Sequence, residues 1–250
     1  PGINHDQTRY AADGSWFDCD KIRFRSGLPE KIGGWTAYSG AVPDGVTRAL
    51  FNFVALDDSN YMAVGTNLRY YIEEGGDLFN VTPIRKTSSL GANPIETGAA
   101  GSGIVSVSDL NHGAVANDFV TLSGATTTDG VTAAQLNTTH QVVAVISVNL
   151  YTIDTGGSAS SGSTAGGGSS VTTQYEINTG LDVGVSGTGW GTSTWGRLAW
   201  GSSAAAELNN SDRLRLWSQD SFGEDLIFCV RDGGVYYWDK SDGTGTRAVA

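Results

Sequence analysis

The chain has 250 residues, of which 39% are hydrophobic and 10% aromatic, so it can build a buried core and is not disordered throughout. Its net charge of -11 argues against a protein that holds nucleic acid by neutralising phosphates with Lys and Arg. Only two cysteines, Cys19 and Cys229, are present, which excludes a disulfide framework and a four-cysteine zinc site. There is no apolar run of about 18 residues, so we expect no membrane partner.

A charged strand is the first pattern along the chain. Strand alternation puts Lys21, Arg23 and Arg25 on one face. Ile22 and Phe24 then lie on the other face. The pattern fits a solvated edge strand that charge protects from aggregation. It equally fits a basic strip that pairs with an acidic neighbouring subunit.

Four consecutive strands are predicted next, with turns rich in Asp, Asn and Gly between them. The strands cover residues 48–56, 61–65, 68–73 and 78–81. They form a four-stranded antiparallel meander.

The composition changes to Ser, Thr, Ala and Gly over residues 89–178, which predicts a separate domain. Strands are expected at 103–107, 119–122, 140–148, 150–154 and 171–177, with one short helix within 131–137. This spacing favours a small β-sandwich or barrel. The Gly/Ser-rich run at 156–170 has nothing apolar to bury, so we expect a flexible surface loop there.

A Gly/Trp stretch follows over residues 187–201 and contains Trp190, Trp195 and Trp200. Tryptophans among glycines can anchor an irregular loop or a subunit contact, or they can stack on a sugar. Anchoring or subunit contact is the favoured interpretation.

A second strand unit is predicted with strands at 214–218, 226–230 and 235–238. Residues 63–72 align with residues 229–238 without a gap, and a turn and a Tyr-Tyr pair coincide. The alternative is two unrelated hairpins that both favour tyrosine. An internal repeat of small sheets is typical of a β-propeller, because each sheet must bury its apolar face on a neighbour.

The fold class predicted from these patterns is all-β: β-propeller blades with an inserted small β-sandwich or barrel domain. The expected division is 1–88 for an N-terminal segment and the first blade, 89–178 for the insert, and 179–250 for the Gly/Trp loop and a further blade. The chain starts without methionine and stops inside a strand-like pattern. We therefore expect a partial propeller whose C-terminal part is missing.

The sequence WFDCDKIRFRSGLPEKIGGW, from Trp16 to Trp35, is long and distinctive. Together with residues 48–50, 64–67 and 81–84, it resembles the tail nozzle, or packaged-DNA stabilisation, proteins of short-tailed bacteriophages. The Gly/Trp run and the position of the Ser/Thr-rich domain also look like this family. The resemblance covers nearly the whole chain.

The resemblance implies a structural virion protein of the phage tail. It would assemble with copies of itself as a ring, with six-fold symmetry expected, below the portal and the tail adaptor. There it would close the DNA exit channel, retain packaged DNA until ejection, and adjoin tail proteins such as spikes, fibres or a needle. DNA would pass through the channel without specific binding, which suits an acidic chain. Family members are considerably longer than this chain.

No pattern in the sequence predicts catalysis, so we expect no enzyme, no cofactor and no metal. The three histidines are far apart and lack metal-ligand spacing. Neither a nucleophile elbow nor a Walker loop is present. Residues 239–243 faintly resemble a calcium loop but lack its alternating oxygens, so a plain turn is favoured.

The candidate residues are therefore interface residues: Trp16, Lys21, Arg23, Arg25, Trp35, Trp190, Trp195 and Trp200. The alternative function is an extracellular carbohydrate-binding or adhesin module, in which the Gly/Trp loop stacks on sugar rings. A hydrolase on a propeller scaffold is a third reading, and it would need facing carboxylates that the sequence does not reveal.

Overall fold

The computed structural model describes residues 3, 6, 8, 10–11, 13–16, 18–34, 36–37, 40–178, 216–231 and 233–250. The chain divides into two compact units, Pro1–Gly40 and Ala41–Ala250. Within the described residues, β-strands in antiparallel sheets dominate and the only α-helix has four residues. The all-β prediction is confirmed. No helix among these residues is long and apolar enough to cross a membrane.

The first unit contains one β-hairpin. Strands β1 (Ile22–Arg25) and β2 (Leu28–Lys31) pair antiparallel, with Arg25 opposite Leu28. The two residues between them, Ser26 and Gly27, both have positive φ, at 50° and 84°. Two consecutive positive-φ residues form the tight turn whose twist matches that of paired strands.

The second unit begins with the predicted four-stranded meander, which is confirmed. Its strands are β3 (Thr47–Val54), β4 (Asn60–Thr66), β5 (Tyr70–Glu74) and β6 (Asp77–Asn80), paired in chain order. Side chains alternate between the two faces of a strand. The inner face carries Phe53, Tyr61 and Ile72, all buried.

A three-stranded sheet ends the chain. It consists of β15 (Trp217–Phe222), β16 (Asp225–Val230) and β17 (Val235–Trp238). Val249 adds a bridge to Tyr237 at the free side of β17. The expected first strand at 214–218 overlaps β15 at Trp217 and Ser218, and β15 continues to Phe222, where the two-residue turn begins. Residues 214 and 215 lie outside the described residues.

The gapless overlay of 63–72 on 229–238 is wrong in register. Ala63 lies opposite Ile72, whereas Trp238 lies opposite Leu226 and not opposite Cys229. Leu226 precedes Cys229 by three residues, and an odd shift moves every side chain to the other face of the sheet. The two hairpins therefore share a meander plan without residue-by-residue equivalence.

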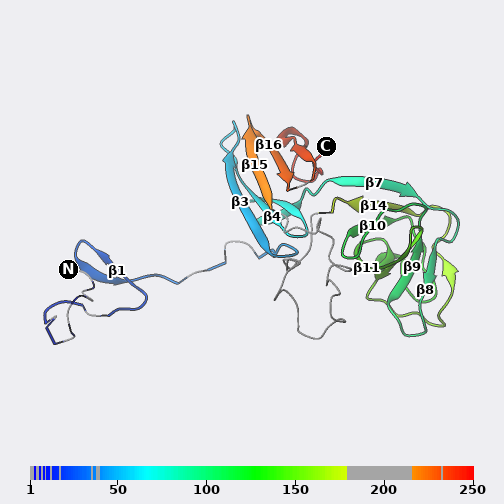
Figure 1. Cartoon of the computed structure of the whole chain (residues 1–250), viewed down its shortest axis with the longest axis horizontal. Coiled ribbons are helices and arrows are strands. Elements are labelled where there is room, and N and C mark those ends of the chain that lie inside the picture. The colour runs from blue at the N-terminus through cyan, green and yellow to red at the C-terminus, as the bar shows by residue number, and fades with distance from the viewer. Residues whose placement is uncertain are drawn as a thin grey trace, which may run out of the picture. The chain divides into compact units, whose positions relative to one another are not determined.

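The two sheets pack face to face and bury one aromatic core (Figure 1). The rings of Tyr70 and Phe228 stack at 4.0 Å with an interplanar angle of 7°. Trp217 packs against both rings, and its indole N–H donates to the Thr66 carbonyl at 2.6 Å. A Cβ at Gly65 would come within 2.4 Å of the Trp217 ring, so this close approach requires glycine. We call these two sheets the two-sheet body.

Residues 84–176 form an eight-stranded sheet in the order β13-β8-β9-β12-β11-β10-β14-β7 (Figure 1). Its strands are β7 (Ile84–Ser89), β8 (Ile95–Thr97), β9 (Ile104–Ser108), β10 (Phe119–Ser123), β11 (Thr139–Ser147), β12 (Leu150–Asp154), β13 (Ala165–Gly166) and β14 (Thr172–Glu176). The short helix predicted within 131–137 is present as α1 (Ala133–Leu136), capped by Thr132.

This sheet changes partners in the middle of β11. The first residues of β11 pair with β10, and from Val142 onward, past two register shifts, it pairs with β12. Bulges of this kind bend a strand and increase its twist. The residues on both sides of the bend contribute to one core. Among the described strands the sheet stays open between β13 and β7, so no closed barrel forms.

The Gly/Ser-rich run at 156–170, expected to be a flexible surface loop with nothing apolar to bury, makes specific contacts and contains strand β13. Ala159 is buried and its backbone bonds to Gly101 and Ser102. The Asp129 carboxylate accepts from the Ser161 N–H, the Ser161 hydroxyl and the Gly162 N–H, at 2.9, 2.7 and 2.7 Å. The prediction missed these contacts because they are made by backbone groups and short polar side chains.

Candidate functional site

The hairpin of the first unit presents the basic side chains singled out from the sequence. Arg23 and Arg25 are exposed and alternate with the half-buried Ile22 and Phe24, as predicted. The strip is partly neutralised, because Arg23 Nε donates to Glu30 Oε2 across the hairpin at 3.1 Å. Arg25 faces Leu28 instead.

Lys21 is outside the strand. It precedes β1 with a φ of 56°, and its ammonium lies 3.9 Å from the Asp20 carboxylate. Both of these side chains are highly exposed. Lys21 therefore does not share the strand alternation of Arg23 and Arg25, and the basic strip consists of those two residues.

Trp16 is half exposed, and its ring lies 6.4 Å from that of Phe24, so it covers the apolar face of the hairpin. It also forms a bridge with Ile3. The remaining candidates, Trp35, Trp190, Trp195 and Trp200, lie outside the described residues.

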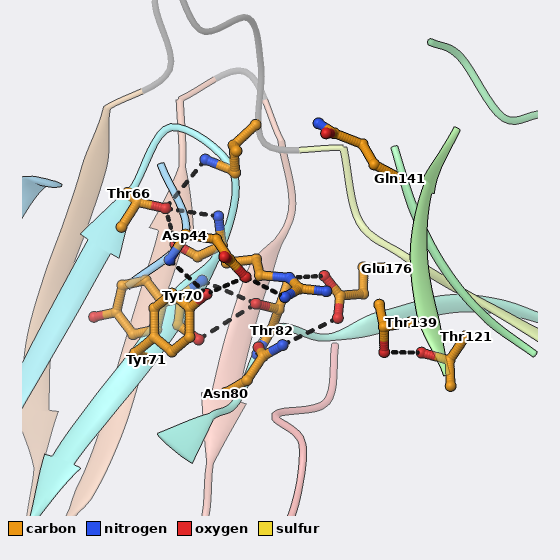
Figure 2. Close-up of polar contacts among 12 residues, drawn as sticks. Asp44, Thr66, Tyr70, Tyr71, Asn80, Thr82, Thr121, Thr139, Gln141 and Glu176 are labelled. Carbon is orange, nitrogen blue, oxygen red and sulfur yellow. Dashed lines mark hydrogen bonds and ion pairs between the residues drawn. The ribbon is translucent and has the colours of Figure 1, made fainter. Parts of the chain in front are cut away.

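The best-connected polar cluster in the second unit was not singled out from the sequence. It centres on Arg69, which lies between β4 and β5 and is 8% exposed. The Arg69 Nε donates to Glu176 Oε2 at 2.9 Å, and Nη1 donates to the Asp44 carboxylate. Its guanidinium carbon lies 3.7 Å from the centre of the Phe119 ring, a cation–π geometry. Figure 2 shows Asp44 and Glu176 among the side chains of this cluster.

Glu176 is the hub of this cluster and is 1% exposed. Besides Arg69, its carboxylate accepts from Asn80 Nδ2 at 3.1 Å (Figure 2). It also lies 3.0 Å from Arg247 Nη2. Arg247 also donates to the Thr82 carbonyl at 3.0 Å. One carboxylate at the end of β14 thus binds three donors, which come from the turn between β4 and β5, from β6 and from the segment after β17.

The charges of the cluster balance, with two carboxylates facing two guanidinium groups. Burial is the largest single influence on the pKa of Arg69 and lowers it, but the charge and hydrogen bond of Glu176, together with those of Tyr71, outweigh burial and hold the pKa above its usual value. Burial of paired charges is tolerated only where geometry and hydrogen bonds compensate desolvation. The cluster therefore fixes how the end of β14 meets the two-sheet body. Among the described residues, Arg69 Nη2 has no hydrogen-bond partner.

A second buried network lies inside the eight-stranded sheet. The hydroxyl of Tyr175 donates to Asp109 Oδ2 at 2.6 Å, and Thr173 donates to the same oxygen at 3.1 Å. His112 accepts from the Ala114 N–H through Nδ1, and its Nε2 lies 3.0 Å from the Ser147 carbonyl. The His112 ring nitrogens are thus occupied by the backbone. No group of three or more His, Cys, Asp or Glu side chains that could hold a metal occurs in the described parts of the chain.

Neither cluster was accessible to sequence reasoning. Arg69 and Glu176 are 107 residues apart, and each alone looks like an ordinary turn or strand residue. The one available signal was an acidic residue, Glu176, in a strand between Tyr175 and Ile177, because carboxylates are seldom buried without a partner.

Comparisons with known proteins identify no family. No family model matches the chain, and no curated protein matches it. One structural neighbour is titled "Phage phi92 endosialidase", with a TM-score of 0.31 and 12% sequence identity. The match covers 89% of this chain, which spans about a third, 32%, of that structure. An overlap of this size assigns neither a fold family nor a function.

Proposed function

We propose that this chain is a structural virion protein of the tail nozzle of a short-tailed bacteriophage, acting through shape and subunit contacts. The observation that carries the proposal is the motif from Trp16 to Trp35, which resembles that family. Its central part folds as the β1–β2 hairpin within a unit distinct from residues 41–250.

The hairpin is suited to binding a neighbour. A two-stranded hairpin is marginally stable alone in water. Both strands have four residues, and every residue of β2 is exposed. A partner that covered Leu28 would bury apolar surface and would face the charge of Arg25, which lies on the same face of the hairpin.

The two-sheet body supports the same proposal. Two antiparallel meander sheets stacked face to face are the arrangement of adjacent propeller blades. In the proposed nozzle the blades form the wall of a channel, and the net charge of -11 lets DNA slide past without adhering. A ring of six copies below the portal and tail adaptor is the arrangement that the family resemblance implies.

Residue-level imaging of intact particles tests the location. We expect the fold of residues 41–250 in a ring at the end of the tail, with DNA ending above it. Particles assembled without this chain should package DNA and then lose it, measured as nuclease-protected DNA per particle. Placement in the capsid shell, or full DNA retention without the chain, would refute the nozzle role.

Charge reversal tests the basic strip as a subunit contact. Arg25→Glu should reduce the number of copies per particle at least about tenfold, because like charges at an interface cost several kcal/mol. Lys31→Glu is the matched control: it lies opposite Ile22, on the other face of the same hairpin. Equal incorporation of both variants would leave Arg25 as an ordinary solvated edge residue.

A further inference from the structure

The hairpin of β11 and β12 exposes a run of apolar side chains. Strand β11 pairs with β10 only as far as Gln141, and past that residue β12 is the one described strand that pairs with it. The second half of β11 is therefore an edge strand, and such edges readily associate with other strands. The exposed apolar side chains of this half and of the turn after it are Val143, Val145, Ile146 and Val148, between 40% and 63% exposed.

A neighbouring segment, residues 109–117, widens this apolar surface. The backbone N–H groups of Asp109 and Asn117, at its two ends, donate to carbonyl oxygens of the hairpin at 3.0 and 2.8 Å. Leu110 and Val115 in this segment are 75% and 48% exposed. The aliphatic patch is our name for the six exposed side chains together: Leu110, Val115, Val143, Val145, Ile146 and Val148.

The aliphatic patch is uncharged. Residues 110–117 and 141–149 contain no Asp, Glu, Lys or Arg, although the chain has a net charge of -11. The two acidic residues that flank the first segment, Asp109 and Asp118, are buried and hydrogen-bonded. Lys86 lies at the rim of the patch and donates to a backbone carbonyl of the first segment at 2.8 Å.

The composition of the patch indicates the kind of partner. Interfaces between proteins that also exist apart are about as polar as the rest of the surface, whereas homodimer interfaces are more apolar. Every member of the patch is aliphatic. A basic partner would be attracted to the carboxylates elsewhere on this acidic chain, and an acidic partner would be repelled. The same patch on a second copy is uncharged and apolar, so it fits.

We propose that two copies of this chain associate through the aliphatic patch about a two-fold axis, with the β11 edge of one copy against that of the other. A two-fold contact uses the same surface on both copies. The aliphatic side chains then leave water, and the contact buries no charged side chain of either segment. Residues 110–117 and 141–149 approach the number that one side of a standard interface contributes, about 20–30 residues.

This contact goes beyond the nozzle assignment and does not rest on it. A two-fold contact joins a pair, whereas a ring needs two different surfaces on each copy. A chain that pairs through the patch yet is absent from virions would refute the proposed function and leave the contact intact. A chain that is in the tail nozzle but stays monomeric in solution would do the reverse.

Sedimentation velocity tests the association. Wild-type chain should convert from monomer to dimer as its concentration rises to about 100 µM. Ile146→Asp, and Val148→Asp in the turn, each place a carboxylate in the apolar contact and should raise the dimer dissociation constant at least about tenfold. Val235→Asp is the matched control, because Val235 is 64% exposed on β17 and the substitution adds the same charge outside the patch. Circular dichroism checks that each variant is folded.

A mixture shows whether both copies use the same surface. Fluorescently labelled Ile146→Asp should bind wild-type chain more weakly than labelled wild type does, because the altered patch is half of every two-fold contact. In a head-to-tail contact the variant would keep one intact surface and bind wild-type chain normally. Normal binding, an equal loss in Val235→Asp, or unchanged dimers of either folded patch variant would overturn the proposal. So would wild-type chain that stays monomeric, and its flotation with phosphatidylcholine vesicles would assign the patch to a lipid surface instead.

Discussion

The two large cores of this protein are built from different side chains. Among the described residues, six of the 14 core residues of the two-sheet body are aromatic, whereas in the core of the eight-stranded sheet only Tyr151 and Tyr175 among 15 are. Two separate sheets gain a large contact area from flat rings that stack across the gap between them. In the single bent sheet, both halves pack around short branched side chains. The pairing between its strands already fixes how the two halves lie relative to each other.

The largest effect on the free energy of unfolding is expected from a substitution that removes one ring from the aromatic core. Phe228→Ala should lower the free energy of unfolding by about 3–5 kcal/mol, because Tyr70 and Trp217 lose a buried partner. Leu122→Ala, in the aliphatic core, is the comparison and should cost about 2–5 kcal/mol. Denaturant titration gives both values, and tryptophan emission should shift only for Phe228→Ala. An equal shift in both variants would contradict separate cores.

The next effect concerns the cluster that ties β14 to the two-sheet body. Glu176→Gln leaves Arg69 and Arg247 buried without their shared anion, and it should cost about 3 kcal/mol of unfolding free energy. Asp57→Asn removes an ion pair to Lys240 at the surface, and we expect a much smaller change. If both substitutions had the same effect in denaturant titrations, the cluster would not join the two parts.

The smallest expected effect is a pH dependence of the Gly/Ser-rich run. Hydrogen bonds led by that of the Ser161 hydroxyl lower the pKa of Asp129 to about 2, from an ordinary value of 3.8. The contribution of the ionised Asp129 carboxylate to stability is therefore complete above pH 3.8 and is lost as the pH falls through 2. The amide signals of Ser161 and Gly162 should titrate by NMR with a midpoint near 2, and a midpoint near 3.8 would show that the run is not held by Asp129.

Sequence patterns located the strands whose own residues favour a strand conformation. Residues 235–238 and 150–154 were placed with the observed bounds, because β-branched and aromatic residues there stand between turn formers. Strand β7 reads Ile-Arg-Lys-Thr-Ser-Ser and was missed, since its polar residues gain a strand conformation only by pairing with β14. The propensity of a residue is overridden by its neighbours in the sheet.

The residues of the candidate site were harder to predict from the sequence than the strands. Arg23 and Arg25 were found because strand alternation is a local rule, and Lys21 was misplaced because a positive φ at that residue leaves no mark in the sequence. Glu176 was missed since its three partners, Asn80, Arg69 and Arg247, become neighbours only in the folded chain.

The long sequence separation inside the aromatic core has a consequence for synthesis. Tyr70 contacts residues about 150 positions later in the chain, and its hydroxyl donates to Gln219, 149 residues away. At roughly 5–20 residues per second, a ribosome needs on the order of 8–30 s to supply that partner. The nascent four-stranded sheet must hold Phe53, Tyr61 and Tyr70 uncovered during this interval. We therefore expect newly made chains to need chaperone protection until translation passes β16.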